Sequence, residues 1–506
     1  MKQIYASLMM LITVKSFGQL NMPPNSYSAG LGTSITTNID FAALLSNPSN
    51  LGWQHNYYKH QFSFKIFDVS GSYYSPVNAN YILNEVVDAD LMNDELTVKT
   101  PFNTVGEILW SYNTKDFRHD TVFTLKERAD MSKRLQEKSA LSFNRVLFGA
   151  SYVSPGHGTF AVQVSNEVYS NIQLSENAAN LLLLGKVNPY FDSLVLANGT
   201  VIPNTYPSVS NDTLSQIVHA FSNNPITVGQ QLNGSLFQFM KTRNFTFGWG
   251  NTYKELFAGW QTYIGASINF IQGGVYQDWK TIDNEFYMRD ASEVTVENTN
   301  KKRSPGKGLS LTFGLSLIKN EKLILGASVR NLGGIRWKYS EENGVIDYNS
   351  KDDKLVFDYF FGASPDVSFD DQWAQSNLFI STGTNYTEKG KFYTATPATF
   401  AIGAKYLVAK PFYVSLDVIT PVVQSVVGSM ETVYAALGLE LELNKFGLTT
   451  GINNNFGQFN VPFGITFGSK KSRFTFNIST FDLANYFRGK EMENLTIGAG
   501  LVYRAK

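Results

Sequence analysis

Alternation of apolar and polar residues over the last part of the chain, 397–506, limits its fold more than any other sequence feature. In 432–443 an apolar side chain stands at every second position from Val433 to Leu443, with polar or small residues between. The same pattern recurs in 411–420 and 473–478. A period of two is typical of a β-strand with two unlike faces. The chain is therefore expected to form a sheet with one apolar and one polar face.

Segments of about ten residues with this alternation, repeated between turns, are what a transmembrane antiparallel β-barrel requires. Such segments recur along most of the chain, and they predict an all-β fold of fourteen to sixteen strands. Sixteen includes weak candidates such as 354–361, and their omission gives fourteen. The expected strands are 57–67, 142–154, 158–168, 242–250, 260–271, 308–318, 322–331, 354–361, 376–383, 397–408, 411–420, 432–443, 446–453, 461–468, 473–481 and 494–503.

The connections between these strands support a barrel in an outer membrane. Short turns such as 155–157 and 319–321 alternate with long polar loops, of which 68–141 and 169–241 are the longest. Short turns on the periplasmic side and long loops outside are typical of outer-membrane barrels. A secreted soluble β-sandwich or propeller has the same alternation, but it does not explain this regular order of turns and loops.

Composition excludes several classes of protein. The 42 Lys and Arg residues balance 42 Asp and Glu residues, which argues against a nucleic-acid binder with a basic face. Only 17% of the residues are charged, whereas Phe, Tyr and Gly number 38, 26 and 40, as suits a barrel with aromatic girdles. The chain has no Cys, so disulfides, thiolate catalysis and Cys-ligated metals are excluded.

The N-terminus reads as an export signal. Lys2 precedes an apolar run, 8–14, and small residues stand at Ser16 and Gly18 before an expected cleavage site. Residues 1–18 are thus expected to be a signal peptide, although a buried N-terminal helix has a similar pattern. No later stretch approaches the ~20 apolar residues of a membrane-spanning helix.

The segment that follows, 19–56, is expected to form an N-terminal plug ahead of a barrel formed by 57–506. Its apolar stretch 39–45 predicts a short helix, which the Asn47-Pro48 pair ends. An ordinary surface turn fits the same pattern. The residues expected to form the plug or gate are Asp40, Phe41, Leu44, Leu45, Asn47 and Pro48.

Charged residues on the polar strand faces are expected to point into the barrel lumen. A charge facing lipid near the bilayer midplane costs about 2–4 kcal/mol, so the lumen is the more favourable side. These residues either form a structural network or line a path for permeation. They are Arg330, Lys405, Asp417, Glu440, Glu442 and Arg473.

Sequence motifs for catalysis or metal binding were not found. The five His residues show neither i, i+4 pairing nor HExxH spacing, and the chain has no G-x-S-x-G elbow and no P-loop. We therefore expect no enzymatic activity, no catalytic residue, no metal and no cofactor.

The order of parts resembles FadL-type and PorV-like outer-membrane barrels of Bacteroidota. The residues that carry the resemblance are 40–51, similar to that group's N-terminal Asn-Pro-Ala plug motif with Ser49 in place of Ala, the phrase 328–333 and the closing strand 495–503. The FadL-type resemblance implies fourteen strands and a plug that gates hydrophobic molecules. The PorV-like resemblance implies a partner-binding barrel of type IX secretion.

Two functions follow from this reading. One is passive, plug-gated and porin-like uptake of hydrophobic or small solutes across the outer membrane. The alternative is a non-transporting barrel that binds partner proteins in a secretion or surface-assembly system. The expected partners are membrane lipid together with either a hydrophobic small molecule or secretion-system proteins, and no nucleic acid. An apolar pocket under the plug favours transport, whereas apolar external loops without a continuous lumen favour partner binding.

Overall fold

The computed structural model describes most of the chain. The described residues are 36–38, 41–57, 61–74, 125–136, 139–253, 255–293, 304–338, 343–349, 390–423, 427, 433–443, 445–454, 459–468, 472–487 and 494–505. The expected signal peptide 1–18, Asp40 and the expected strands 354–361 and 376–383 lie outside the described residues.

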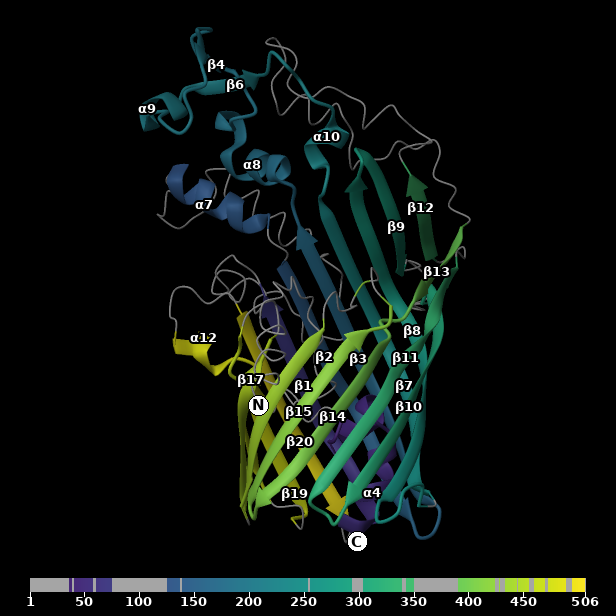
Figure 1. Cartoon of the computed structure of the whole chain (residues 1–506). Coiled ribbons are helices and arrows are strands. Elements are labelled where there is room, and N and C mark those ends of the chain that lie inside the picture. Colours follow the sequence, from purple (N-terminus) through teal and green to yellow (C-terminus); the bar gives the residue numbers. More distant parts are fainter. Residues whose placement is uncertain are drawn as a thin grey trace.

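Fourteen antiparallel strands pair with their neighbours in a ring that β20 and β1 close (Figure 1). Strand β11 pairs directly with β14, so the ring closes without strands at 354–361 or 376–383. The transmembrane barrel and the lower predicted strand number are confirmed. The strands of the ring are β1(Phe62–Tyr74), β2(Ser139–Ser154), β3(Gly158–Gln173), β7(Leu236–Tyr253), β8(Gln261–Ile282), β10(Gly306–Lys319), β11(Leu323–Lys338), β14(Thr399–Ala409), β15(Phe412–Pro421), β16(Tyr434–Glu442), β17(Phe446–Asn453), β18(Phe463–Phe467), β19(Phe474–Thr480) and β20(Asn494–Ala505).

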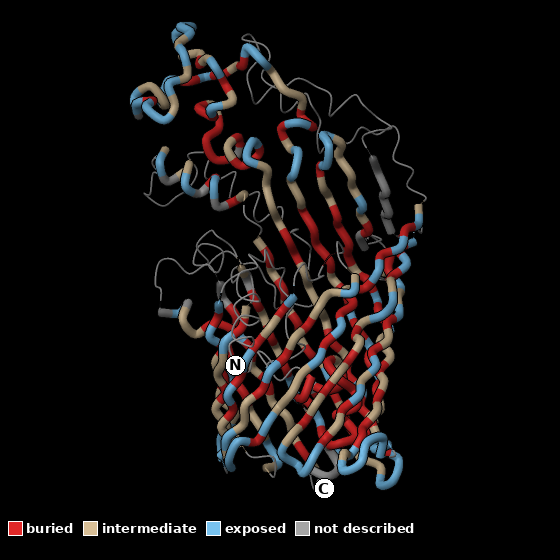
Figure 2. Tube along the Cα trace, viewed as in Figure 1, coloured by how far each residue is buried: buried red, intermediate tan, exposed pale blue. Residues whose placement is uncertain are grey.

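The two faces of the barrel differ as the alternation predicts. On β7, Phe245 and Phe247 are exposed on the outer face, whereas Thr246 between them is buried on the inner face. Figure 2 shows the same change between exposed and buried positions along the lower wall. An outer band of exposed Phe, Leu and Ile is stable only against lipid, because such a surface in water is a large unfavourable apolar patch.

The turns and loops separate to opposite ends of the barrel, as expected. The β2–β3, β10–β11 and β14–β15 connections are short and lie at one end, here called the short-turn end. The other end, the long-loop end, carries the connections that follow β1, β3 and β8 (Figure 1).

Several strands continue farther toward the long-loop end than the sequence predicted. β1 covers 62–74 instead of 57–67, and β8 has 22 residues whereas β18 has 5. At about 3.3 Å per residue, one side of the wall is several times taller than the other. The predicted ends of these strands were wrong because the extensions bury polar side chains such as Asp278, and a search for apolar alternation does not detect them. β9(Glu285–Glu293), β12(Asn343–Asn349) and β13(Lys391–Ala395) extend this taller side.

Two long loops contribute to a small folded module above the barrel, here called the loop module (Figure 1). Its apolar core includes Leu184, Phe191 and Leu194, and Leu125 from the β1–β2 loop packs against it. The elements of the loop module are α7(Leu125–Leu135), α8(Glu176–Leu184), η1(Gly185–Val187), β4(Ser193–Leu196), β5(Val201–Pro203), α9(Asn211–Leu214), β6(Ile217–Phe221) and α10(Val228–Leu232).

The N-terminal segment, described over Thr36–Asn38 and Phe41–Tyr57, lies inside the barrel near the short-turn end (Figure 1). It forms α3(Phe41–Ser46) and α4(Ser49–Tyr57). Pro48 separates the two helices, as expected, but the second helix was not predicted from the sequence. Helix α12(Leu483–Phe487) lies between β19 and β20. None of the helices in the described residues has the length and apolar character needed to cross a membrane.

Candidate functional site

Close contact with glycines places the N-terminal segment against one side of the lumen. A Cβ added to Gly250 of β7 would lie 2.7 Å from the Gly52 nitrogen, and one added to Gly149 of β2 would lie 3.3 Å from the Phe41 ring. Cβ contacts below 3.0 Å are essentially unknown in proteins. Glycine at position 250 therefore allows the backbone of the segment to approach the wall directly, and glycine at position 149 leaves room for the Phe41 ring.

The turn between α3 and α4 is held by a network of polar side chains. Asn47 Nδ2 donates to the Thr36 carbonyl at 2.8 Å and to Ser316 Oγ of β10 at 3.0 Å. Ser316 Oγ in turn donates to Asn50 Oδ1 at 2.6 Å and lies 2.8 Å from Ser49 Oγ. Each of these side chains is fully buried, so every bond in the network replaces one that water would otherwise make.

Charged residues of the wall hold the N-terminal part of the segment. Asp417 of β15, which is fully buried, accepts hydrogen bonds from the backbone nitrogen and the hydroxyl of Thr36. The ammonium group of Lys65 on β1 lies 5.3 Å from the centre of the Phe41 ring and forms an ion pair with Asp68 at 2.9 Å. Thr36 and Phe41 are thus attached to different parts of the wall, β15 and β1.

The structure places the remaining residues that were predicted to form the plug as follows. Leu44 is fully buried and packs with Leu51 against Ala161 of β3. Pro48 lies against the backbone of Gly265 on β8. Leu45 is half-buried and lines a cavity on the long-loop side of the segment. An apolar pocket under the segment was the feature expected for transport. Instead, Phe41 and Leu44 pack against the wall.

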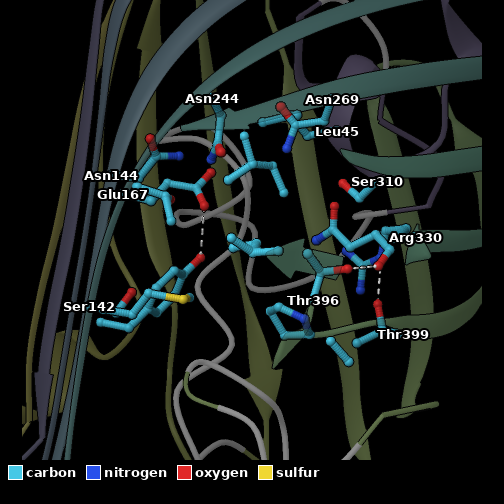
Figure 3. Close-up of a pocket in the computed structure, with 18 residues that line it drawn as sticks. Leu45, Ser142, Asn144, Glu167, Asn244, Asn269, Ser310, Arg330, Thr396 and Thr399 are labelled. Carbon is cyan, nitrogen blue, oxygen red and sulfur yellow. Dashed lines mark hydrogen bonds between the residues drawn. The ribbon is translucent and has the colours of Figure 1, made fainter. Parts of the chain in front are cut away.

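The cavity beside Leu45 lies within the lumen and has a mostly polar lining (Figure 3). It contains about 920 Å³ of empty space, some of which is open to solvent. Polar side chains from β2, β3, β7, β8, β10 and β11 line it, and Met240, Ile271 and Ile335 form its apolar part. We call it the lumen pocket.

Arg330 is the predicted lumen residue that reaches this pocket. Its Nε donates to Thr399 Oγ1 of β14 at 2.9 Å, and its side chain is buried. Glu167 of β3 lies on the other side of the lumen pocket and accepts a hydrogen bond from Tyr169 at 3.2 Å (Figure 3). Glu167 was not predicted from the sequence, although its position continues the inward alternation of Gln163 and Ser165 on β3.

Other predicted lumen residues lie away from the lumen pocket. Lys405 of β14 forms an ion pair with Glu440 of β16, and its ammonium group lies 4.8 Å from the centre of the Tyr413 ring. Glu442 lies two residues farther along β16 and is half-buried. Arg473 differs from the expectation: it is exposed and precedes β19 in the short turn, because the strand begins one residue later.

Among the described residues, no cluster of three or more His, Asp or Glu side chains is arranged to hold a metal ion. The lumen thus contains the N-terminal segment near the short-turn end and the lumen pocket beside it.

Comparison with known proteins gave similarity to solved structures only. No family model matches the chain, and no curated protein matches it. A TodX deltaS2S3 mutant monoaromatic hydrocarbon channel is 10% identical with a TM-score of 0.43, covering 95% of this chain and 98% of that one. A FadL homologue of Pseudomonas aeruginosa is 8% identical with a TM-score of 0.40, covering 97% and 100%. The P. putida toluene transporter TodX is 11% identical with a TM-score of 0.39, covering 96% and 98%. These scores are below 0.5, and the architecture above rests on the strand pairings of this chain alone.

Proposed function

We propose that this chain is an outer-membrane channel for the uptake of small or hydrophobic solutes, with the N-terminal segment acting as a movable plug. In this proposal residues 1–18 direct export, 19–56 form the plug and 57–506 form the barrel. The short-turn end faces the periplasm and the long-loop end faces outward. A solute enters the lumen pocket from outside and passes when the plug shifts.

The polar attachment of the plug is the observation that carries this proposal. Asn47, Ser49 and Asn50 bind Ser316 through hydrogen bonds, and no disulfide fixes the segment to the wall, because the chain has no Cys. A hydrogen bond inside a protein contributes only about 0.5–1.5 kcal/mol net, since water replaces it when it breaks. A network of this kind can therefore open and reform in a lumen that water enters.

The second candidate is a non-transporting barrel that binds partner proteins in a type IX-like secretion or surface-assembly system. The loop module favours it, because this module has its own apolar core and carries the exposed residues Val201 and Val218. A barrel that only presents such a module does not need a plug that moves. The two candidates therefore differ in what happens when the plug is fixed.

A reversible disulfide tests the proposal directly. Ser49 Oγ and Ser316 Oγ lie 2.8 Å apart, so the double variant Ser49→Cys/Ser316→Cys places two thiols within reach of a disulfide. The absence of any other Cys makes the link unambiguous. Ion conductance in planar bilayers and the swelling of liposomes in a pentose solution report whether the lumen is open.

Conductance and swelling are expected to fall when the double variant is oxidised and to return when it is reduced. Each single Cys variant serves as the control and should respond to neither treatment. Equal flux in the oxidised and reduced states would contradict the plug. No flux in any state, with a folded barrel that captures a secretion partner through the loop module, would support the second candidate.

A further inference from the structure

The lumen pocket is lined by two side chains of opposite charge. Arg330 and Glu167 both line it, on strands that β7, β8 and β10 separate. Among the described residues, neither side chain forms an ion pair. At about 4.8 Å per strand, the two strands are roughly 19 Å apart along the wall, so the side chains approach the pocket from different sides (Figure 3).

The guanidinium of Arg330 is buried but incompletely bonded. Its Nε donates to Thr399, whereas its Nη2 has no hydrogen-bond partner in the described part of the chain. The carboxylate of Asp417 acts on it electrostatically, but that carboxylate is already bonded to Thr36 of the plug. A buried cation with an unused donor is costly, and an oxyanion placed beside it would remove the cost.

Glu167 presents the opposite chemistry. Its carboxylate accepts from the hydroxyl of Tyr169 at 3.2 Å, and Asn244 lies beside it in the pocket lining (Figure 3). Both neighbours are neutral, so the negative charge has no cation beside it in the described structure. An ammonium group entering the pocket would form a charge-assisted hydrogen bond there.

Amide side chains line the pocket together with the two charges. Asn144, Asn244, Asn269 and Asn331 all belong to its lining, and Asn244 Oδ1 has no hydrogen-bond partner in the described residues. A side-chain amide both donates and accepts, as a peptide group does. Met240 and Ile271 add an apolar area that an aliphatic side chain can cover.

We propose that the lumen pocket binds a short peptide or a solute of the same dipolar chemistry, with its carboxylate at Arg330 and its ammonium at Glu167. This inference rests on the proposed uptake function and names the class of solute. Three residues of extended peptide span about 10 Å, which suits two charges held on separate strands better than a single amino acid does. The Asn side chains bond the peptide groups between the charged ends.

Binding of trialanine to the full-length protein in detergent micelles, measured by calorimetry, tests this. N-acetyl-trialanine lacks the ammonium group and trialanine amide lacks the carboxylate. Each is expected to bind at least about tenfold more weakly, because a hydrogen bond to a charged group contributes about 1.5–3 kcal/mol. The variants Glu167→Gln and Arg330→Gln should each bind trialanine at least about tenfold more weakly than the unaltered protein does.

The pairing of variant and ligand gives the sharpest result. Glu167→Gln should bind N-acetyl-trialanine as tightly as it binds trialanine. Arg330→Gln should bind trialanine amide as tightly as it binds trialanine. Glu285→Gln is the matched control, since Glu285 of β9 accepts from Tyr287 at 2.6 Å as Glu167 does from Tyr169. Arg243→Gln, on the exposed outer face, is the control for Arg330.

Equal affinity for the three peptides would overturn the inference, as would the absence of trialanine binding to a heat-modifiable, folded protein. If the pentose swelling of the reduced double Cys variant persists in that case, the uptake function stands and only the solute class is wrong. If trialanine binds with the expected selectivity but no solute passes in any state, the uptake function fails and the binding site remains.

Discussion

Gly52 of the plug packs directly against the backbone of β7, so Gly52→Ala sets a steric clash against a gain in helix propensity. A Cβ at this position would lie 2.6–2.8 Å from backbone atoms of Asn251 on β7, which cannot rotate away as a side chain can. Overpacking of this kind costs about 1–3 kcal/mol, and contact with fixed backbone places it near 3 kcal/mol. Alanine also favours helix α4 by about 1 kcal/mol relative to glycine.

The steric cost is larger, so the seated plug should lose about 2 kcal/mol. This corresponds to a roughly 30-fold shift toward the unseated state. Single-channel conductance measures the shift as a higher open fraction, and faster protease cleavage within 36–57 reports it independently. The heat-modifiability of the barrel should not change, because the substitution lies in the plug.

Two further variants separate plug displacement from general effects of glycine replacement. Gly265→Ala introduces a Cβ at Pro48 from the wall side and should open the channel in the same way. Gly447→Ala lies on the inner face of β17, where the new Cβ would meet its nearest atoms at 3.6 and 3.7 Å, and should have no effect. A lower open fraction in Gly52→Ala would refute the reasoning, since helix propensity would then outweigh the contact.

Three other predictions follow from the charges. Lys405→Met leaves the buried carboxylate of Glu440 without its ion-pair partner and should lower the free energy of unfolding of the barrel by about 3–5 kcal/mol. Replacing both Lys405 and Glu440 by Met should restore most of this lost stability, and urea unfolding in micelles measures the stability of each variant. Asp417→Asn keeps an acceptor for the plug but removes its charge, so the open fraction in single-channel recordings should rise several-fold, and an unchanged fraction would count against the role of Asp417. Burial raises the pKa of Asp290 on β9 above its value in the unfolded chain, while a hydrogen bond from Gln277 opposes the shift. The folded state therefore keeps the Asp290 carboxyl protonated up to a higher pH than the unfolded state does. The stability of β9 should therefore be greatest below the unfolded pKa and fall as pH rises through the folded pKa, and amide hydrogen exchange should lose this pH dependence in Asp290→Asn.

Sequence alternation located the ring because burial on one face of a strand repeats every second residue. The final part of the chain shows this clearly: Phe412 and Leu416 are exposed to lipid, and Ser415 and Asp417 are buried inside, as the pattern predicts. The extensions of β1 and β8 were missed because their buried positions carry polar residues such as Ser70, Ser72 and Asp278, which a search for apolar alternation does not detect. Helix α4 was missed because its sequence, Ser49–Tyr57, is mostly polar and buries polar rather than apolar side chains.

The sequence by itself determined the barrel class, its fourteen-to-sixteen strands and which residues face lipid, because each of these depends on the order of neighbours along one strand. Only the tertiary structure decided that Thr36 meets Asp417, that Ser316 meets Asn47 and that Glu167 faces the same pocket as Arg330. These partners belong to strands far apart in the chain. Their meeting depends on the register of every strand pair between them and on the closure of the ring, and no local pattern records either.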